Sequence, residues 1–235
     1  MGKHGAEYAR VERDLYPTPA WVIDALAEHV ELTGMTVWEP ACGDGGMARA
    51  LRAHGANVFA SDVATHTKHL HSVADFLDPR PGSLRPRCDM IITNPPFGPR
   101  GTLAVAFIET GLVRLTHEGQ ALALLLPCDF DSARTRSHLF GDCPHFAAKI
   151  VLTKRIVWFG RNDGVREAPK ENHAWFLWQR SPLRLRHAPV ILYAPVKAAA
   201  ELPYDAADDF SGAIDDCYAA IRDRVAAGGK TWKPK

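Results

Sequence analysis

Asp89-Met-Ile-Ile-Thr-Asn-Pro-Pro-Phe97 is the stretch of sequence that decides how this chain folds. Its first half, Met90–Thr93, is apolar and β-prone and predicts a short buried strand. The strand ends at Asn94-Pro95-Pro96-Phe97, the Asn-Pro-Pro-Phe motif, because two successive prolines remove two backbone donors and fix two φ angles. We therefore expect a rigid strand end that presents one amide and one aromatic ring.

The chemistry of this motif suits a planar amino group. The side-chain carbonyl of Asn94 is one hydrogen-bond acceptor and the backbone carbonyl of Pro95 is a second, so the pair can accept both N–H groups of one amine. Phe97 can stack on the flat group that carries the amine. A strand end with two acceptors and a ring is a sensible place to hold a nucleobase by its exocyclic amine.

A glycine-rich turn lies upstream of this motif. Residues 35–39 form a predicted strand, Glu39-Pro-Ala-Cys-Gly-Asp-Gly-Gly46 forms the turn, and residues 47–54 form a predicted helix. Strand, glycine-rich turn and helix in this order are the first unit of a doubly wound sheet. The turn lacks the G-x-G-x-x-G pattern, and Glu39 and Asp44 flank its glycines, which disfavours a pyrophosphate and favours a cationic or hydroxyl-bearing ligand.

Two acids farther along the chain are candidates for binding a nucleoside. Asp62 follows the predicted strand 57–61 and lies nineteen residues after Gly43, about where an acid holds ribose hydroxyls in nucleoside-binding Rossmann units. Asp75 precedes Phe76, and it either accepts a hydrogen bond from an adenine amine or caps a turn. Both alternatives for Asp75 stay open from the sequence.

The chain before the glycine turn contains Tyr16-Pro-Thr-Pro19. Thr18 is a predicted N-cap and Pro19 the first residue of a helix with one apolar stripe. This loop either only positions the helix or covers a bound ligand.

The remaining elements continue an α/β pattern. The sequence predicts helices over residues 102–115 and 133–140, and strands over residues 121–126, 150–157 and 173–178. An acidic amphipathic helix is predicted over residues 206–227. We expect a catalytic domain over residues 1–190 and a C-terminal helical extension and tail over residues 191–235.

A basic segment spans the last two predicted strands. Residues 147–187 carry nine Lys and Arg against three Asp and Glu, a net charge of +6, whereas residues 198–227 carry seven acids against two Arg, a net charge of −5. Such segregation is typical of a face for a polyanion, and also of an ordinary solvated surface. Neighbouring aromatic and cationic groups suit single-stranded or flipped nucleotides, although aromatic residues at a strand end are more often core. The candidate nucleic-acid contacts are Trp158, Phe159, Arg161, Arg166 and Lys170, together with Arg100 in the link after the Asn-Pro-Pro-Phe motif.

Composition and residue spacing argue against several classes of protein. No window reaches the roughly 18 uninterrupted apolar residues of a membrane span, and the N-terminus MGKHGAEYARVERD is too charged for a signal peptide, so we expect a cytoplasmic protein. The five cysteines are scattered and never spaced C-x-x-C, which predicts neither a disulfide framework nor a zinc site. The spacing of His66, His69 and His71 fits no common ligand pattern, so no metal is expected.

In the order of its motifs, the chain resembles the S-adenosylmethionine-dependent DNA amino-methyltransferases over about residues 14–180. It is similar in particular to small phage-type and bacterial adenine-N6 methyltransferases, in which an N-terminal loop comes first, the glycine-rich motif second and Asn-Pro-Pro-aromatic third. The resemblance implies a doubly wound, Rossmann-like α/β methyltransferase fold with a seven-stranded, mostly parallel sheet and a final antiparallel strand. It also implies S-adenosyl-L-methionine as cofactor and nucleic acid, DNA in particular, as partner.

The resemblance further implies roles for individual residues. Residues 94–97 match the catalytic motif. The glycine-rich motif would hold the methionine moiety, Asp62 the ribose and the Asp75-Phe76 pair the adenine ring, while the loop around Tyr16 would close over the cofactor. The implied cofactor contacts are Tyr16, Thr18, Pro19, Glu39, Pro40, Ala41, Cys42, Gly43, Gly45, Asp62, Asp75 and Phe76.

Two features depart from the pattern of that family. The aromatic residue of the motif is Phe97 where Tyr is more frequent, which keeps stacking and loses a hydroxyl. No large target-recognition domain is present, which bears on sequence-specific recognition of duplex DNA.

Other functions share the same chemistry. Methylation of cytosine N4, of adenine in RNA or of a protein glutamine amide uses an equivalent amine, and a cofactor-binding nucleic-acid module without turnover is a further alternative. The basic stretch near residues 158–170 favours nucleic acid. An NAD-dependent enzyme is disfavoured by the absent G-x-G-x-x-G pattern.

Overall fold

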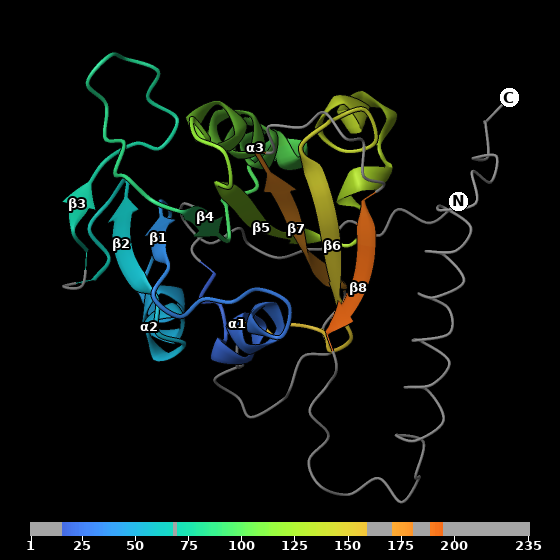
Figure 1. Cartoon of the computed structure of the whole chain (residues 1–235), viewed down its shortest axis with the longest axis horizontal. Helices are drawn as coiled ribbons and strands as arrows, with labels where there is room; N and C mark the ends of the chain where they lie inside the picture. Colours follow the sequence, from blue (N-terminus) through green and yellow to red (C-terminus); the bar gives the residue numbers. More distant parts are fainter. Residues whose placement is uncertain (1–15, 68–69, 159–170, 181–188, 195–235) are drawn as a thin grey trace, which may run out of the picture. The chain divides into compact units, whose positions relative to one another are not determined.

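The computed structural model describes residues 16–67, 70–158, 171–180 and 189–194. Within these residues one mixed sheet has the strand order β3-β2-β1-β4-β5-β7-β6-β8 (Figure 1). The strands are β1 (Thr36–Glu39), β2 (Asn57–Asp62), β3 (Ser72–Val73), β4 (Met90–Thr93), β5 (Ala121–Pro127), β6 (Phe146–Leu152), β7 (His173–Gln179) and β8 (Val190–Ala194). The helices are α1 (Ala20–Ala27), α2 (Gly46–Ala53) and α3 (Thr102–Arg114), with 3₁₀ turns η2 (Pro99–Gly101), η3 (Phe130–Ser132) and η4 (Arg134–Leu139).

The pairing of the strands confirms the expected doubly wound α/β class. Parallel pairs join β1 to β2 and β4, β2 to β3, β4 to β5, and β6 to β8, whereas β7 is antiparallel to both β5 and β6. The described sheet has eight strands where seven were expected. Strands β3 and β8 were not among the elements predicted from the sequence; among the described strands β8 pairs with β6, and it spans the expected domain boundary at residue 190. The predicted helix over residues 206–227 lies outside the described residues.

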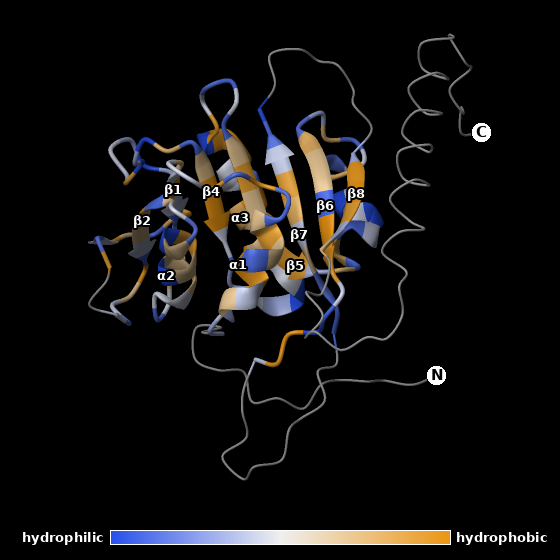
Figure 2. Cartoon of the chain, turned by 60° about the horizontal axis from the view of Figure 1, so that its bottom comes forward, coloured by the Kyte–Doolittle hydropathy of each residue, from blue (hydrophilic) through white to orange (hydrophobic). Residues whose placement is uncertain are grey.

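Helices cover both faces of the sheet. In Figure 1, α1 and α2 lie on one side of the strands and α3 lies on the other. Strands β4, β5, β6 and β8 are mainly hydrophobic (Figure 2), and every residue of β4 is buried. Strands covered on both faces appear in sequence as continuous apolar runs, which explains why β4 and β5 were predictable.

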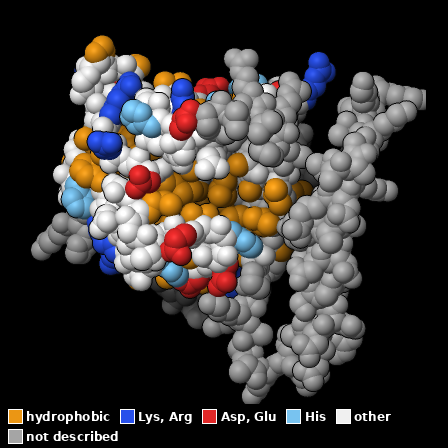
Figure 3. Space-filling model, in the orientation of Figure 1, with side chains coloured by type: hydrophobic (Ala, Val, Ile, Leu, Met, Phe, Trp, Pro, Cys, Tyr) orange, Lys and Arg blue, Asp and Glu red, His pale blue; other side chains and the backbone are white. Residues whose placement is uncertain are grey.

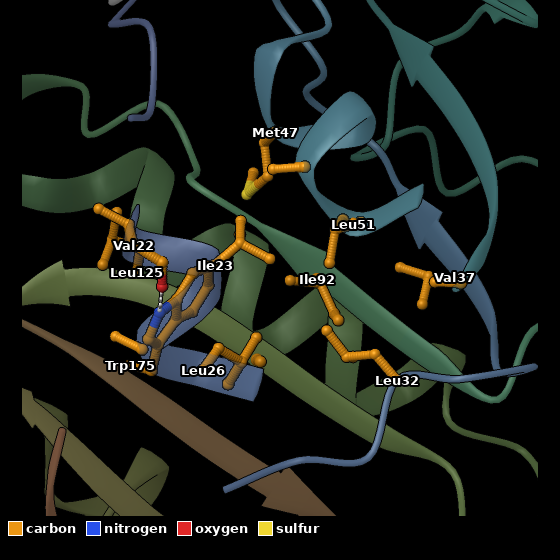
Figure 4. Close-up of a cluster of buried hydrophobic side chains, with 14 of the residues drawn as sticks. Val22, Ile23, Leu26, Leu32, Val37, Met47, Leu51, Ile92, Leu125 and Trp175 are labelled. Carbon is orange, nitrogen blue, oxygen red and sulfur yellow. Dashed lines mark hydrogen bonds between the residues drawn. The ribbon is translucent and has the colours of Figure 1, made fainter. Parts of the chain in front are cut away.

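A tryptophan from β7 closes the core beneath α1. The fully buried Trp175 donates a 2.9 Å hydrogen bond from its indole Nε1 to the backbone carbonyl of Val22 (Figure 4). Leu26 of α1, Leu51 of α2 and Ile92 of β4 lie in the same hydrophobic cluster. This packing anchors α1, and with it the loop that precedes α1, to the centre of the sheet.

Aromatic residues dominate the core beneath α3. The ring of Phe76 lies edge-on to Trp38 with centroids 5.1 Å apart, and 4.9 Å from the ring of Phe107. Gly111 allows α3 to approach β5 closely, because a Cβ atom there would lie 2.7 Å from Leu122 Cδ2. The loop that carries Phe76 therefore shares one core with α3.

Some element boundaries differ from the sequence predictions. Pro19 occupies the N-cap position of α1 and no side chain caps the helix, so the predicted Thr18 cap is wrong. Residues 134–139 form the 3₁₀ turn η4 instead of the predicted helix. Strand β6 begins at Phe146 and ends at Leu152, because the chain bends at residues 153–154.

Candidate active site

The carboxyl ends of β1, β2 and β4 meet around a cavity of about 260 Å³. This is the edge at which doubly wound sheets bind ligands. The structure brings most of the predicted site residues together there, and the predicted residues that line the cavity are Tyr16, Thr18, Glu39, Pro40, Ala41, Cys42, Gly43, Asp62, Asp75, Phe76, Asn94 and Pro96. The cavity is also lined by residues that the sequence did not predict as cofactor contacts, namely Pro17, Asp44, Met47, Val63, His66, Leu77, Leu103 and Phe107.

The glycine turn is shaped by positive backbone angles and by a buried carboxylate. Gly43 has φ 51° and Gly45 has φ 76°, a region that favours glycine, and Gly45 is the N-cap of α2. The Gly43 N–H donates to Asp62 Oδ2 at 2.9 Å, and the Ala64 N–H donates to Asp62 Oδ1 at 3.1 Å. Asp62 thus ties the turn after β1 to the turn after β2, and each of its oxygens keeps a lone pair for a ligand.

Cys42 forms part of the cavity wall and is chemically inert there. Burial, assisted by the neighbouring Glu39 and Asp62 carboxylates, raises the pKa of the Cys42 thiol to about 12. A neutral thiol is a poor nucleophile, so Cys42 lines the cavity without acting as a reactive group.

Glu39 is a buried acid at the end of β1. Its side chain is 1% exposed, and its Oε2 atom has no hydrogen-bond partner in the described part of the chain. Burial raises the pKa of Glu39 well above its ordinary value, and the nearby Asp44 and Asp62 carboxylates act in the same direction, against the attraction of Arg52. A buried carboxylate with an oxygen that lacks a partner is stabilised by a cation, so this wall suits a positively charged ligand group.

The side-chain amide nitrogen of Asn94 is hydrogen-bonded, whereas its oxygen has no partner among the described residues. Its Nδ2 donates a 3.2 Å hydrogen bond to Thr18 Oγ1, from the loop before α1. Its Oδ1 is buried and has no partner among the described residues. The buried Thr18 hydroxyl therefore orients the amide so that Asn94 presents an acceptor, which is also why Thr18 does not cap α1.

The other members of the Asn-Pro-Pro-Phe motif differ in their position relative to the cavity. Pro95 is buried, and the half-buried Phe97 ring lies edge-on to Phe130 at 6.5 Å. Neither side chain lines the cavity, whereas Pro96 does. The backbone carbonyl of Phe97 accepts a hydrogen bond from Leu103, which joins the motif to α3.

The two alternatives for Asp75 are compatible in the structure. Asp75 Oδ1 accepts a 2.8 Å hydrogen bond from the Leu77 N–H, so the carboxylate caps a turn. Asp75 also lines the cavity beside the buried ring of Phe76. One carboxylate oxygen therefore shapes the loop and the other is left for a ligand.

Arg114 is a buried cation that the sequence analysis missed. Its side chain, 8% exposed, donates from Nη2 to the Phe76 carbonyl at 2.7 Å and from Nη1 to the Leu84 carbonyl at 3.0 Å. Its guanidinium also lies 5.2 Å from the Trp38 ring centroid and 5.0 Å from that of Phe76. An arginine on the apolar stripe of a helix was the signal available in the sequence. Its role here is to hold the loop that carries Phe76 against the cavity.

Replacing Arg114 by methionine should destabilise the protein by about 2–4 kcal/mol, because buried carbonyls of the loop lose a charged donor. Arg80 lies in the same loop, is 82% exposed at its side chain and pairs with Asp78 alone among the described residues, so Arg80→Met should unfold at the wild-type urea midpoint. Urea unfolding of both variants checks this. Equal midpoints for Arg114→Met and wild type would show that the loop does not depend on Arg114.

The candidate nucleic-acid residues are only partly within the described chain. Trp158 lies edge-on to Tyr16 at 5.7 Å and to His173 at 5.2 Å, so it packs beside the loop that lines the cavity. Burial lowers the pKa of His173 to about 4, and this ring is neutral at pH 7. Arg100 is exposed in η2, immediately after the Asn-Pro-Pro-Phe motif. The remaining candidates, Phe159, Arg161, Arg166 and Lys170, lie outside the described residues.

The described part of the chain has an apolar band on its surface, but no candidate metal site and no helix that could span a membrane. Figure 3 shows hydrophobic side chains gathered across one face, between the positions of α3 and α1 in Figure 1, with acidic and histidine side chains around them. In the described part of the chain, no three His, Cys, Asp or Glu side chains are grouped as a metal site would require. No helix among the described residues is both long and apolar enough to span a bilayer.

Comparisons with known proteins identify the fold. No family model and no curated protein matches the sequence. A structure described as the modification subunit of a type I restriction enzyme from Vibrio vulnificus aligns with 18% identity and a TM-score of 0.50, over 93% of this chain and 54% of that chain. A structure described as an RNA methyltransferase from Pyrococcus horikoshii aligns with 14% identity and a TM-score of 0.52, over 75% of this chain and 92% of that chain. This chain thus has the Rossmann-like fold of methyltransferases and spans about half the length of the Vibrio chain.

Proposed function

We propose that this chain transfers a methyl group from S-adenosyl-L-methionine to the exocyclic N6 amine of adenine in DNA. The observation that carries the proposal is the free Asn94 Oδ1, a buried acceptor without a partner among the described residues, at the wall of the cavity. An unpaired buried acceptor is unfavourable, so it marks a position where a ligand donor completes the hydrogen bond.

The charge of the cavity lining suits the cofactor. Among the described residues that line it, four are acids and none is Lys or Arg. This wall attracts the ammonium of the methionine moiety and disfavours a pyrophosphate. In the proposed arrangement Glu39 receives the ammonium, Asp62 the ribose hydroxyls, and Asp75 with Phe76 the adenine ring. When bound, S-adenosyl-L-methionine supplies an electrophilic methyl group on a sulfonium sulfur.

The motif at the end of β4 would activate the amine. The lone pair of an adenine N6 atom is delocalised into the ring, so the amine is a poor nucleophile. If Asn94 Oδ1 and the Pro95 carbonyl accept its two N–H bonds, the nitrogen becomes more pyramidal and its lone pair can point at the methyl group. The amine loses one proton to solvent after transfer, and no separate general base is assigned.

The substrate class is proposed from the order of the sequence motifs. The two neighbours differ, one described as the modification subunit of a type I restriction enzyme and the other as an RNA methyltransferase. The order of motifs favours adenine in DNA. Cytosine N4, adenine in RNA and a protein glutamine amide present an equivalent amine and are the alternative substrates.

One experiment tests the proposal directly. The protein is incubated with methyl-labelled cofactor and with single-stranded DNA, duplex DNA, RNA and a protein pool, and the modified group is identified by mass spectrometry. N6-methyladenine in DNA is expected. Label in RNA or protein would redirect the proposal to that substrate, and tight binding of the cofactor without transfer to any pool would contradict it.

Thr18→Val should lower kcat by about 3- to 10-fold, because the loss of one neutral hydrogen bond lets the Asn94 amide rotate away from its acceptor orientation. The KM for the cofactor should rise less. Thr116→Val, at an exposed position at the opposite edge of the sheet, is the matched control. Steady-state kinetics that show the same kcat in both variants would remove this role from Thr18.

A further inference from the structure

Arg100 has an unusual backbone conformation for its residue type. It lies in η2 with φ 56° and ψ 24°, between Gly98 at φ 63° and Gly101 at φ 78°. It is the one residue other than glycine with positive φ in the described part of the chain. This region costs an L-residue about 1–2 kcal/mol, and Arg lacks the short polar side chain that helps Asn and Asp to occupy it.

Contacts from the neighbouring elements hold Arg100 in this conformation. Arg136 donates from Nη2 to the Arg100 carbonyl at 3.3 Å and from Nη1 to the Phe130 carbonyl at 2.9 Å. The Arg136 guanidinium stacks on the Phe130 ring at 3.8 Å, and Phe130 in turn meets the ring of Phe97. The strained turn is therefore connected through two side chains to the Asn-Pro-Pro-Phe motif.

The side chain of Arg100 makes no contact that would stabilise the described fold. It is exposed, and within the described residues it has no hydrogen bond or ion pair. A glycine at this position would remove the strain without the loss of any contact seen here. A strained residue that stabilises nothing around it points to a role outside the folded chain itself.

The location of Arg100 matches a need of the proposed reaction. The acidic cavity offers no cation for the phosphate of a target nucleotide, because Lys and Arg are absent from its described lining. Arg100 lies six residues after Asn94, in the turn that follows the carboxyl end of β4. A guanidinium binds a phosphate through two parallel hydrogen bonds, which suits it to hold a backbone next to a reacting base.

We propose that Arg100 is a phosphate-binding residue, whose guanidinium contacts the nucleic-acid backbone beside the nucleotide that enters the Asn94 site. The proposal rests on the proposed function, since it requires a nucleic-acid substrate. It accounts for the presence of an arginine where a glycine would be less strained.

Binding of fluorescent single-stranded DNA, duplex DNA and RNA, measured by anisotropy at several salt concentrations with S-adenosylhomocysteine present, tests the proposal. Arg100→Gly should weaken binding about 5- to 20-fold and reduce the slope of log K against log salt by about 0.7 for single strands or 0.9 for duplex. Arg100→Lys should keep the slope. The melting temperature of Arg100→Gly should be equal to that of the wild type or up to about 3 °C higher.

The matched control is Arg87→Gly, an exposed position before β4 and thus at the opposite edge of the sheet. It should bind nucleic acid like the wild type. Unchanged affinity and slope in Arg100→Gly, or an equal loss in Arg87→Gly, would overturn the role of Arg100 and leave the proposed function standing. Failure of the wild type to bind any of the three nucleic acids would instead remove the proposed function, and this inference with it.

Discussion

Asn94→Ala should lower kcat by about 10²- to 10³-fold, the range found when one preorganised polar group of an active site is removed. The side-chain carbonyl is the acceptor that would bind the substrate amine, and alanine has no polar group to replace it. Binding of the cofactor should change little, because its ammonium and ribose would be held by Glu39 and Asp62 on the neighbouring strands. The loss should therefore fall on kcat and not on the cofactor KM.

The measurement for Asn94→Ala is single-turnover transfer of labelled methyl, with calorimetric binding of S-adenosylhomocysteine as the test of an intact site. Asn57→Ala, an exposed asparagine at the start of β2 and at the opposite edge of the sheet, is the matched control and should react at the wild-type rate. Wild-type turnover by Asn94→Ala would exclude amine activation by this residue.

Glu39→Gln should weaken S-adenosylhomocysteine binding by about 10- to 100-fold, the value of a charge-assisted hydrogen bond in a buried site. Gln keeps the shape and the acceptor of the side chain but cannot carry the charge that the ligand ammonium requires. The same variant should be as stable as the wild type at pH 7, or more stable, because it removes a buried acid without a partner at Oε2.

The pH dependence of binding follows from the raised pKa of Glu39. The ligand ammonium favours the ionised carboxylate, so the wild-type affinity should fall as the pH is lowered through that raised pKa, and binding should release a proton. Without ligand, the folded protein holds this proton more tightly than the unfolded chain. The contribution of Glu39 to the free energy of unfolding should therefore decrease as the pH rises from the ordinary Glu pKa to the raised one.

Calorimetry over a pH series, in buffers with different ionisation enthalpies, measures both the affinity and the proton release. Glu39→Gln should abolish the pH dependence in this range. Glu118→Gln, at an exposed turn position, is the matched control and should retain the wild-type profile. A wild-type profile in Glu39→Gln would mean that Glu39 does not meet the charge of the ligand.

The sequence by itself determined the fold class and the edge of the sheet that carries the site. The signals were local: a proline pair that ends β4, a glycine turn after β1, and Asp62 after β2. Each signal ends a strand or turns the backbone, and its effect depends on neighbours within a few residues. Parallel strands then place their carboxyl ends at the same edge of the sheet. For this reason most of the predicted cofactor residues line one cavity.

Only the tertiary structure decided how the site residues are oriented. The hydroxyl of Thr18 was expected at a helix N-cap and instead binds Asn94, 76 positions along the chain. Arg114 supports the Phe76 loop from a different element, and the strain at Arg100 depends on contacts from η4. Such pairings carry no local signature, because they arise only when packing brings distant segments together. The sequence thus specified where the candidate site lies, and packing specified which of its polar atoms are left free for a ligand.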